Sequence, residues 1–252
     1  NNNKSHSSLT LFHDVIHEMW WGWKNVPDIL LRCIYVQFFA FIGFYCMWIY
    51  LADFYGRYIY NGRPRAKEHT KDFNRYVRGI SAANYAYVAM SVIEAIFSLL
   101  LIPLTKRFGI KPVWGGCLAI AGVSLSVTPV LIGSPVGIAI IVNSFIGFGL
   151  CVSFSLPWSI VTKYSLLYDQ NRGGLWTTIF NSSECLAEIF VSLIAGNFVN
   201  IFEHSTAIIM IIGGFSLLVA SLLVLRVKDD LSSFEYQQIH HGQNKHQTTD
   251  NL

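Results

Sequence analysis

Three glutamate residues lie inside long apolar stretches of this chain. Glu94 lies in the middle of one stretch, and Glu184 and Glu188 lie in the middle of another. Polar residues recur around them at intervals of three and four, which puts each set on one helix face. They are Asn84, Tyr87, Ser91 and Ser98 in the first stretch and Thr177, Asn181 and Ser192 in the second. These stripes are the residues whose types and spacing suit proton transfer or the binding of a polar solute.

A carboxylate at the centre of a bilayer costs about 2.5 to 3.5 kcal/mol. We therefore expect the two stripes to face a polar cavity rather than lipid. The alternative is that the polar residues only hold helices together by hydrogen bonds, each worth roughly 0.6 kcal/mol. That alternative suits serine and threonine better than it suits three glutamates.

The elements that position these residues are apolar segments long enough to cross a membrane. A bilayer core roughly 30 Å thick requires about 20 residues of α-helix. Six segments reach that length: 29–52, 80–104, 113–132, 136–161, 175–202 and 206–225. They lack the alternation of barrel strands, and lipid offers no partner to unpaired backbone amides. The sequence therefore predicts an all-α membrane protein with six transmembrane helices.

The composition supports a membrane protein and excludes several other classes. Hydrophobic residues make up 53% of the 252 residues and charged residues only 13%. The net charge of +3 is small, and the basic residues lie in connections, so no nucleic acid partner is expected. All five cysteines fall inside apolar segments, where packing is a better interpretation than a disulfide or a metal site. No cofactor motif is present, and no cofactor or metal is predicted.

Basic residues favour one orientation in the membrane. An even number of spans puts both termini on one side, and that side holds most of the basic connections. These contain Lys106, Arg107, Lys111, Lys163, Arg172, Arg226 and Lys228. The short connections at 133–135 and 202–204 on the other side contain no lysine or arginine, although the long loop 53–79 is basic. Judged on short connections, both termini are predicted to be cytosolic.

The chain divides into three parts. Residues 1–28 are predicted to form a cytosolic segment with an amphipathic helix in the membrane interface, because apolar residues recur there at helical spacing. They are Leu9, Phe12, Ile16, Met19, Trp20 and Trp23. Residues 29–228 form the transmembrane domain, and residues 229–252 are predicted to be a disordered polar cytosolic tail.

The six spans differ in character with a period of three helices. The third and sixth contain no charge and carry small-residue stripes, so they are predicted to be scaffold helices. The other four are predicted to wall a cavity, and the fourth is expected to break at Pro157. Two inverted three-helix repeats of this kind are typical of transporter folds. Aromatic rings beside amide side chains suit a sugar, although an aromatic stripe alone is more often packing. The predicted substrate contacts are Gln37, Trp48, Asn84, Asn143 and Asn181.

Four motifs in order along the chain resemble the sucrose transporters of plants and their animal relatives in the major facilitator superfamily. The resemblance runs from Val26 to Lys228 and corresponds to the C-terminal six-helix half of that family. The matching segments are Asp53-Phe54-Tyr55-Gly56-Arg57 with Tyr60-Asn61-Gly62, Phe108 to Trp114, Ser155-Leu156-Pro157-Trp158-Ser159, and Gly173-Gly174-Leu175 with Asn181 and Val191-Ser192. The family pattern is broken at Leu51, Tyr58 and Ala187-Glu188.

The resemblance implies a secondary active transporter and not an enzyme. Expected partners are a disaccharide such as sucrose, protons, the lipid bilayer and an N-terminal six-helix half. Glu94, Glu184 and Glu188 are predicted to couple transport to protons. Asp53 and Arg57 lie four residues apart; the resemblance favours a gate, and a surface ion pair is the alternative.

The expected location is the plasma membrane or an intracellular vesicle membrane. Two other functions were weighed against transport. A membrane enzyme is disfavoured because no metal-ligand, nucleophile-elbow or phosphate-loop motif is present. A non-transporting scaffold or assembly subunit remains an alternative, but it leaves the three glutamates without a task.

Overall fold

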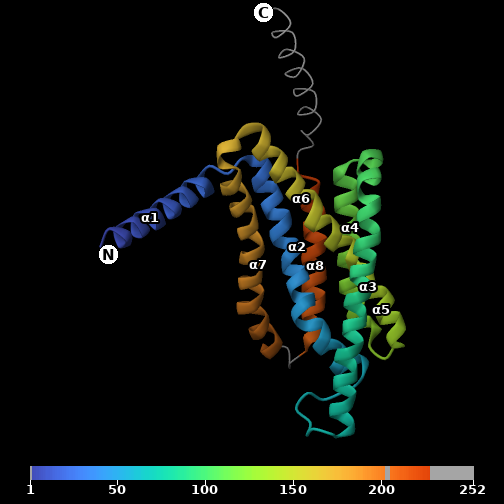
Figure 1. Ribbon diagram of the computed structural model, residues 1–252. Coiled ribbons are helices and arrows are strands. Elements are labelled where there is room, and N and C mark those ends of the chain that lie inside the picture. The colour runs from blue at the N-terminus through green and yellow to red at the C-terminus, as the bar shows by residue number, and fades with distance from the viewer. Residues whose placement is uncertain (1, 202–204, 228–252) are drawn as a thin grey trace, which may run out of the picture.

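The computed structural model describes residues 2–201 and 205–227, with side chains described for 13–196 and 205–227. Its α-helices are α1 (Asn2–Lys24), α2 (Asp28–Phe54), α3 (Lys71–Phe108), α4 (Ile110–Val127), α5 (Val136–Ser144), α6 (Ile146–Tyr168), α7 (Gly173–Ile201) and α8 (Thr206–Val224). A π-helical turn, η1 (Tyr55–Ile59), continues α2, and two short 3₁₀ turns, η2 (Thr128–Leu131) and η3 (Gln170–Arg172), follow α4 and α6. Figure 1 shows the long helices side by side, with α1 projecting from one end.

In the described part of the chain, six helical segments are long and apolar enough to cross a membrane, as the sequence predicts. They are Asp28–Ile59, Lys71–Phe108, Ile110–Leu131, Val136–Tyr168, Gln170–Gly196 and Thr206–Val224. Within the described residues the chain contains helices and turns and no strand. This confirms the all-α membrane fold. The second span begins nine residues earlier than the apolar stretch indicated, because Thr70 caps α3 by accepting a hydrogen bond from the Phe73 amide.

The scaffold helices α4 and α8 pack against each other through small residues. A Cβ atom on Gly122 would lie 2.9 Å from the Gly214 carbonyl oxygen, so the two backbones meet directly. The Ser221 hydroxyl donates to the Gly115 carbonyl at 2.7 Å, and the Ser216 hydroxyl donates to the Phe39 carbonyl at 2.6 Å. Helix α8 therefore joins α4 on one side and α2 on the other.

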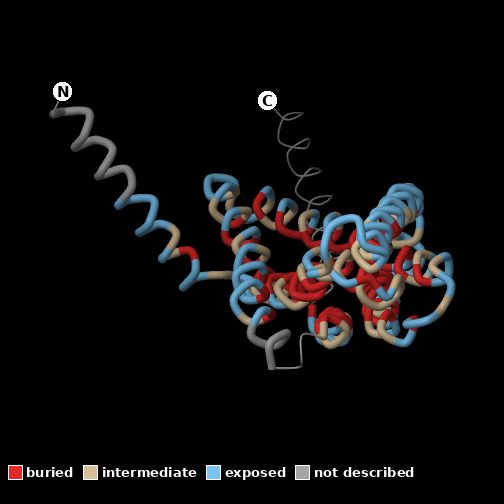
Figure 2. Tube along the Cα trace, turned by 90° about the horizontal axis from the view of Figure 1, so that it is seen from below, coloured by how far each residue is buried: buried red, intermediate tan, exposed pale blue. Residues whose placement is uncertain are grey.

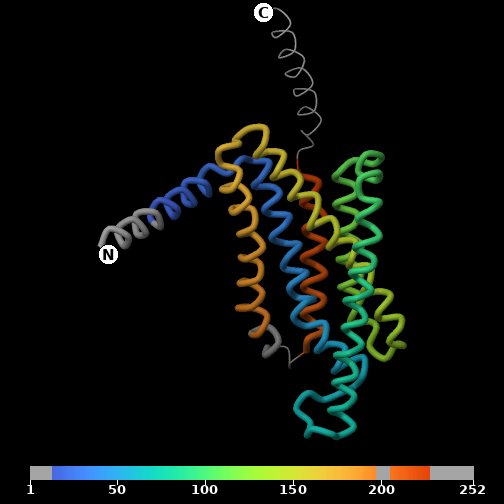
Figure 3. Tube along the Cα trace, in the orientation of Figure 1, coloured from blue at the N-terminus to red at the C-terminus, as the bar shows by residue number. Residues whose placement is uncertain are grey.

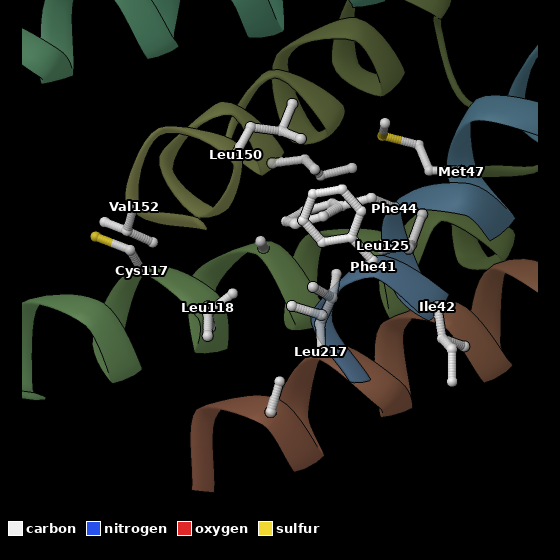
Figure 4. Close-up of a cluster of buried hydrophobic side chains, with 14 of the residues drawn as sticks. Phe41, Ile42, Phe44, Met47, Cys117, Leu118, Leu125, Leu150, Val152 and Leu217 are labelled. Atoms are coloured by element: carbon white, nitrogen blue, oxygen red, sulfur yellow. The ribbon is translucent and has the colours of Figure 1, made fainter. Parts of the chain in front are cut away.

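The buried core lies where α2, α4, α6 and α8 meet. Figure 4 shows Phe41 and Phe44 of α2 among Leu118 and Leu125 of α4 and Leu217 of α8. Phe41 and Phe44 are almost completely buried. The aromatic stripe of the first span is therefore mainly packing at these two positions.

Helices α3 and α7 bury much less of their surface than the others. In the most apolar part of α3 only 17% of the residues are buried, and in α7 33%, against 44% to 61% in the other four spans. Figure 2 shows the buried residues concentrated inside the bundle. The two helices that carry the glutamates thus have long faces that the other described residues leave uncovered.

Three departures from regular helix are linked by one buried hydrogen-bond network. The Asn143 amide donates to the Tyr55 hydroxyl at 2.9 Å and accepts from the Thr128 hydroxyl at 2.7 Å. Tyr55 begins the π-helical turn η1, Thr128 begins η2, and Asn143 lies beside the break at Phe145 between α5 and α6. The network therefore ties together the points at which three spans change geometry.

The expected break at Pro157 is wrong. Helix α6 runs through Pro157 to Tyr168, and the fourth span is interrupted instead at Phe145. Proline is tolerated inside a membrane helix because neighbouring groups and local adjustments satisfy the freed carbonyl.

Four cysteines are buried, which confirms their packing role, whereas Cys185 is exposed. Cys185 lies on the uncovered face of α7. The packing interpretation therefore does not extend to this residue.

Helix α1 rests on the turn between α6 and α7. The Arg172 guanidinium lies 4.1 Å from the centre of the Trp21 ring, and the Trp21 and Trp176 rings are 6.4 Å apart. A Cβ atom on Gly22 would lie 2.5 Å from the Ile179 side chain, so the contact is close. The Trp20 and Trp23 side chains are exposed. The membrane interface as the place of α1 stays a prediction, and the tail 229–252 lies outside the described residues.

The first residues of α2 and the last residues of α8 lie at the same end of the helix bundle (Figure 3). Arg32 pairs with Asp28 at 2.9 Å and also donates to the Arg226 carbonyl at 2.5 Å. These contacts tie the start of the first span to the end of the last one.

Candidate functional site

A buried polar contact joins α2, α6 and α7 near the middle of the spans. The Gln37 amide donates to the Glu184 carboxylate at 2.9 Å and to the Ser153 carbonyl at 3.3 Å. The Trp158 side chain lies near the Glu184 carboxylate. Gln37 is completely buried and Glu184 is half-buried. An N–H donor from α2 therefore reaches the carboxylate on α7, with the Trp158 ring of α6 nearby, which lowers the cost of burying the carboxylate.

Glu188 lies one turn further along α7 and is exposed on the same face. The Tyr45 side chain of α2 lies near both Glu188 and Glu184. Tyr45 is itself only half-buried. The structure thus brings both α7 glutamates to α2, on the open side of the helix pair.

The third predicted proton-coupling residue lies elsewhere. Glu94 is half-buried on α3, near Cys151 of α6. Gly147 of α6 lets the backbones approach there, since a Cβ atom on it would meet the Met90 carbonyl oxygen and lie 3.2 Å from the Glu94 amide nitrogen. In Figure 1, α3 and α7 flank α2 on opposite sides. Glu94 therefore does not share the α7 contact.

A cavity of about 400 Å³ opens between α2, α3 and α6. Trp48, Tyr87, Met90, Ser91 and Leu150 line it. The Tyr87 hydroxyl donates toward the Trp48 carbonyl at 3.2 Å and the Met47 carbonyl at 3.3 Å, which fixes one wall. The volume is within the range of about 300 to 1,000 Å³ that is usual for small-molecule sites.

The other predicted substrate contacts, Asn84, Asn143 and Asn181, are not among the residues that line this cavity. Asn84 is exposed on α3, one turn before Tyr87, and Asn181 is exposed on α7, one turn before Glu184. Asn143 is completely buried, and its side-chain nitrogen and oxygen are both engaged by Tyr55 and Thr128. The geometry gives Asn143 a role in fixing helix ends, and substrate contact by any of these three residues stays a prediction.

The Asp53–Arg57 pair forms as the spacing indicates. The Arg57 Nε atom lies 2.8 Å from one Asp53 oxygen and 2.9 Å from the other. The π-helical turn after Phe54 keeps the two residues on one face. A role as a gate stays a prediction.

The structure adds a third member to this pair. The Tyr76 hydroxyl of α3 donates to Asp53 at 2.9 Å, so the ion pair connects two spans. Close contact of the spans depends on glycines, because a Cβ atom on Gly79 would lie 2.5 Å from the Gly56 Cα atom.

Sequence reasoning missed Ser153, Trp158, Tyr45 and Tyr76 as members of these contacts. Trp158 lies in the Ser-Leu-Pro-Trp-Ser motif, which drew attention only as a family resemblance. Tyr45 lies one turn before Ile49 and two turns after Phe38, within an aromatic run that offers no distinguishing spacing. In the described part of the chain no group of three or more histidine, cysteine, aspartate or glutamate side chains could hold a metal ion.

Comparison with known proteins supports the resemblance drawn from the motifs. No protein-family model matches the chain. The sucrose transport protein SUC3 of Arabidopsis thaliana is 23% identical over 83% of this chain and 38% of its own length. The sucrose transport protein SUT1 of japonica rice is 21% identical over 69% of this chain and 35% of its own length. Solute carrier family 45 member 3 of Homo sapiens is 23% identical over 56% of this chain and 25% of its own length.

These relatives confirm that the chain resembles sucrose transporters of plants and an animal solute carrier. The chain spans less than half the length of the curated relatives it matches. The relatives are transporters by name and not enzymes.

Proposed function

We propose that this chain forms one half of a sugar transporter that works by alternating access and couples sugar uptake to protons. The observation that carries the proposal is the Gln37–Glu184 contact, a hydrogen-bonded carboxylate at mid-span on a helix face that this chain leaves open. Sucrose transporters among the relatives supply the substrate class. The uncovered faces of α3 and α7 suit a second six-helix half, with which they would enclose the pathway.

The proton step in this proposal belongs to the α7 glutamates. A proton that enters from the acidic side binds Glu184 or Glu188, and neutralisation lowers the cost of moving the carboxyl group through the low-dielectric region. Sugar binds the outward-open state, and the two halves then rock about the midplane and release both. Glu94, on the other side of α2, is a second candidate for the same task.

The sugar site in this proposal is the cavity lined by Trp48, Tyr87 and Ser91. The Trp48 ring offers a flat face to the apolar CH side of a sugar, and Ser91 offers a hydroxyl to its edge. Asn84 and Asn181 supply amide groups on the two open helix faces. Gln37 is placed with Glu184 in the coupling contact rather than in the cavity.

The proposed gate is the Asp53–Arg57–Tyr76 contact at the end of the bundle opposite to α1. Both termini of the chain are cytosolic in this arrangement, so the gate faces the outside of the cell or the lumen of a vesicle. The site is closed when the contact is intact and opens when α3 moves away from α2.

Uptake of radiolabelled sucrose, trehalose, maltose and glucose into vesicles tests the proposal. The protein is expressed from its full coding sequence, and uptake is measured with and without an inward proton gradient. Accumulation of one of the disaccharides only with the gradient supports proton symport. Uptake that is equal with and without the gradient retains sugar transport but removes the coupling. No uptake of any sugar by correctly inserted protein favours the scaffold or assembly subunit.

A further inference from the structure

The Gln37 side chain is an unusual partner for the half-buried Glu184 carboxylate because its amide oxygen makes no hydrogen bond within the described residues. Its nitrogen donates to both Glu184 and the Ser153 carbonyl, which occupies its two hydrogens. Its oxygen is buried and has no hydrogen-bond partner among the described residues. The Ser153 hydroxyl is also buried and has no hydrogen-bond partner among the described residues. An unpaired buried acceptor is costly, so its retention requires a reason.

The chemistry of the two groups supplies that reason. An ionised glutamate only accepts hydrogen bonds, whereas a protonated glutamate donates one. A glutamine amide carries both a donor and an acceptor on the same carbon. Rotating the terminal amide by half a turn exchanges its nitrogen and oxygen, so the oxygen then faces the Glu184 carboxyl group.

We infer that Gln37 is a positioning residue that hydrogen-bonds Glu184 in both of its protonation states, by its N–H group when Glu184 is ionised and by its oxygen when Glu184 is protonated. This inference rests on the proposed function, in which Glu184 carries a proton. The unpaired oxygen is the acceptor that the protonated state uses. Glu184 thus stays attached to α2 through the proton cycle, whichever form it takes.

Trp158 provides a contrast within the same contact. Its indole nitrogen is a donor only, so it supports the ionised form of Glu184 and offers nothing to the protonated form. Losing Trp158 should therefore change the balance between the two forms. Losing Gln37 removes a partner from both forms and should change that balance much less.

Other titratable groups near Glu184 are few in the described part of the chain. Tyr45 faces it from α2, and Glu188 and Cys185 lie beside it on α7. Helix α6 faces it with the neutral Ser153 and Trp158, and α8 carries no titratable side chain. Helix α1 contacts α7 nearer its start, at Ile179. Trp158→Phe and Gln37→Met leave all of these neighbouring titratable groups in place, so a difference between the two variants does not come from them.

Infrared spectroscopy of the protein from its full coding sequence, reconstituted in lipid, tests the inference without measuring transport. The band of the protonated Glu184 carboxyl group is identified by its loss in Glu184→Gln, and its intensity is followed against pH. Trp158→Phe removes an N–H group near Glu184 that can support only the ionised form, so the pH at which half of the band is present is expected to rise. Gln37→Met is expected to move that pH by less than about a third as much.

The position of the band gives a second measurement. In the wild-type protein the carboxyl O–H donates to Gln37; in Gln37→Met it does not, so the C=O band moves to higher wavenumber. If Gln37→Met instead moves the titration as far as Trp158→Phe and leaves the band in place, Gln37 is a donor only and the inference is overturned. Gln37→Leu is the second apolar replacement if the methionine variant is not recovered from membranes.

The same data separate this inference from the proposed function. If uptake is not coupled to protons but the infrared shifts are as expected, proton symport is contradicted. The pairing of Gln37 with both forms of Glu184 is then still supported. Proton-coupled uptake in a protein whose Glu184 band never appears at any pH at which the protein stays folded retains symport and overturns the inference.

Discussion

Replacing Tyr76 with phenylalanine removes one hydroxyl group from the proposed gate and leaves the ring in place. The hydroxyl donates to Asp53 at 2.9 Å. The Asp53 side chain is 21% exposed and the Arg57 side chain 34% exposed, so the ion pair itself contributes about 0.2 to 1 kcal/mol after solvent screening. A hydrogen bond to a charged group contributes about 1.5 to 3 kcal/mol, and partial exposure places this one at the low end.

A loss of about 1.4 kcal/mol from the closed state alone changes the balance of two conformations about tenfold. We therefore expect Tyr76→Phe to reduce the maximal rate of sugar uptake about tenfold, because the outer end of the molecule closes less readily. The half-saturation concentration of external sugar should not rise, since the outward-open state becomes more populated. Radiolabelled uptake at several sugar concentrations measures both quantities.

Tyr85→Phe is the matched control. Tyr85 is on the same helix, is 68% exposed and loses the same atom. Equal rates in Tyr76→Phe and Tyr85→Phe, with surface amounts matched by immunoblotting, would refute the gate and leave only a surface ion pair between Asp53 and Arg57.

The remaining predictions concern coupling, packing and selectivity. Replacing the glutamate that carries the proton by glutamine should abolish accumulation driven by a proton gradient while sugar exchange across equal pH continues. Glu184→Gln, Glu188→Gln and Glu94→Gln are compared, and wild-type accumulation in a variant excludes that residue as the proton carrier. Gly122→Val should lower the thermal stability of the purified protein by about 1 to 3 kcal/mol, because the added side chain overpacks α4 against α8. Gly116→Val is the control and should not lower the stability, because the space around Gly116 is open. Equal melting temperatures of the two variants would contradict this prediction. Asn181→Ala should raise the half-saturation concentration or change the sugar ranking, since an unpaired sugar hydroxyl costs about 1 to 3 kcal/mol; an unchanged ranking and affinity places Asn181 outside the site.

The spacing of residues along the sequence is sufficient to predict some features of the structure. The apolar lengths predict the six spans, and the four-residue spacing of Asp53 and Arg57 predicts their ion pair. Small residues such as Gly122 predict close helix packing without naming the partner helix. Each of these depends only on residues within one helix or its immediate neighbour.

Other features depend on contacts that no local pattern contains. Gln37 and Glu184 are 147 positions apart, and Tyr55 and Asn143 are 88 apart. Their pairing is set by how four helices pack, so the sequence indicated polar residues but not which ones meet. The break at Phe145 was missed because neither Phe145 nor its two chain neighbours is a glycine or a proline, whereas Pro157 suggested a break that α6 does not have.

The exposed cysteine on α7 offers a natural chemical probe beside the glutamates. Cys185 lies between Glu184 and Glu188 in sequence, and the other four cysteines are buried. A water-soluble thiol reagent should therefore attach at this one position without any engineered substitution. Its reaction rate reports whether water reaches this face of α7, because a thiolate forms in water and not in lipid. A fluorophore attached there would report the change in its surroundings each time the transport pathway opens to the opposite side of the membrane.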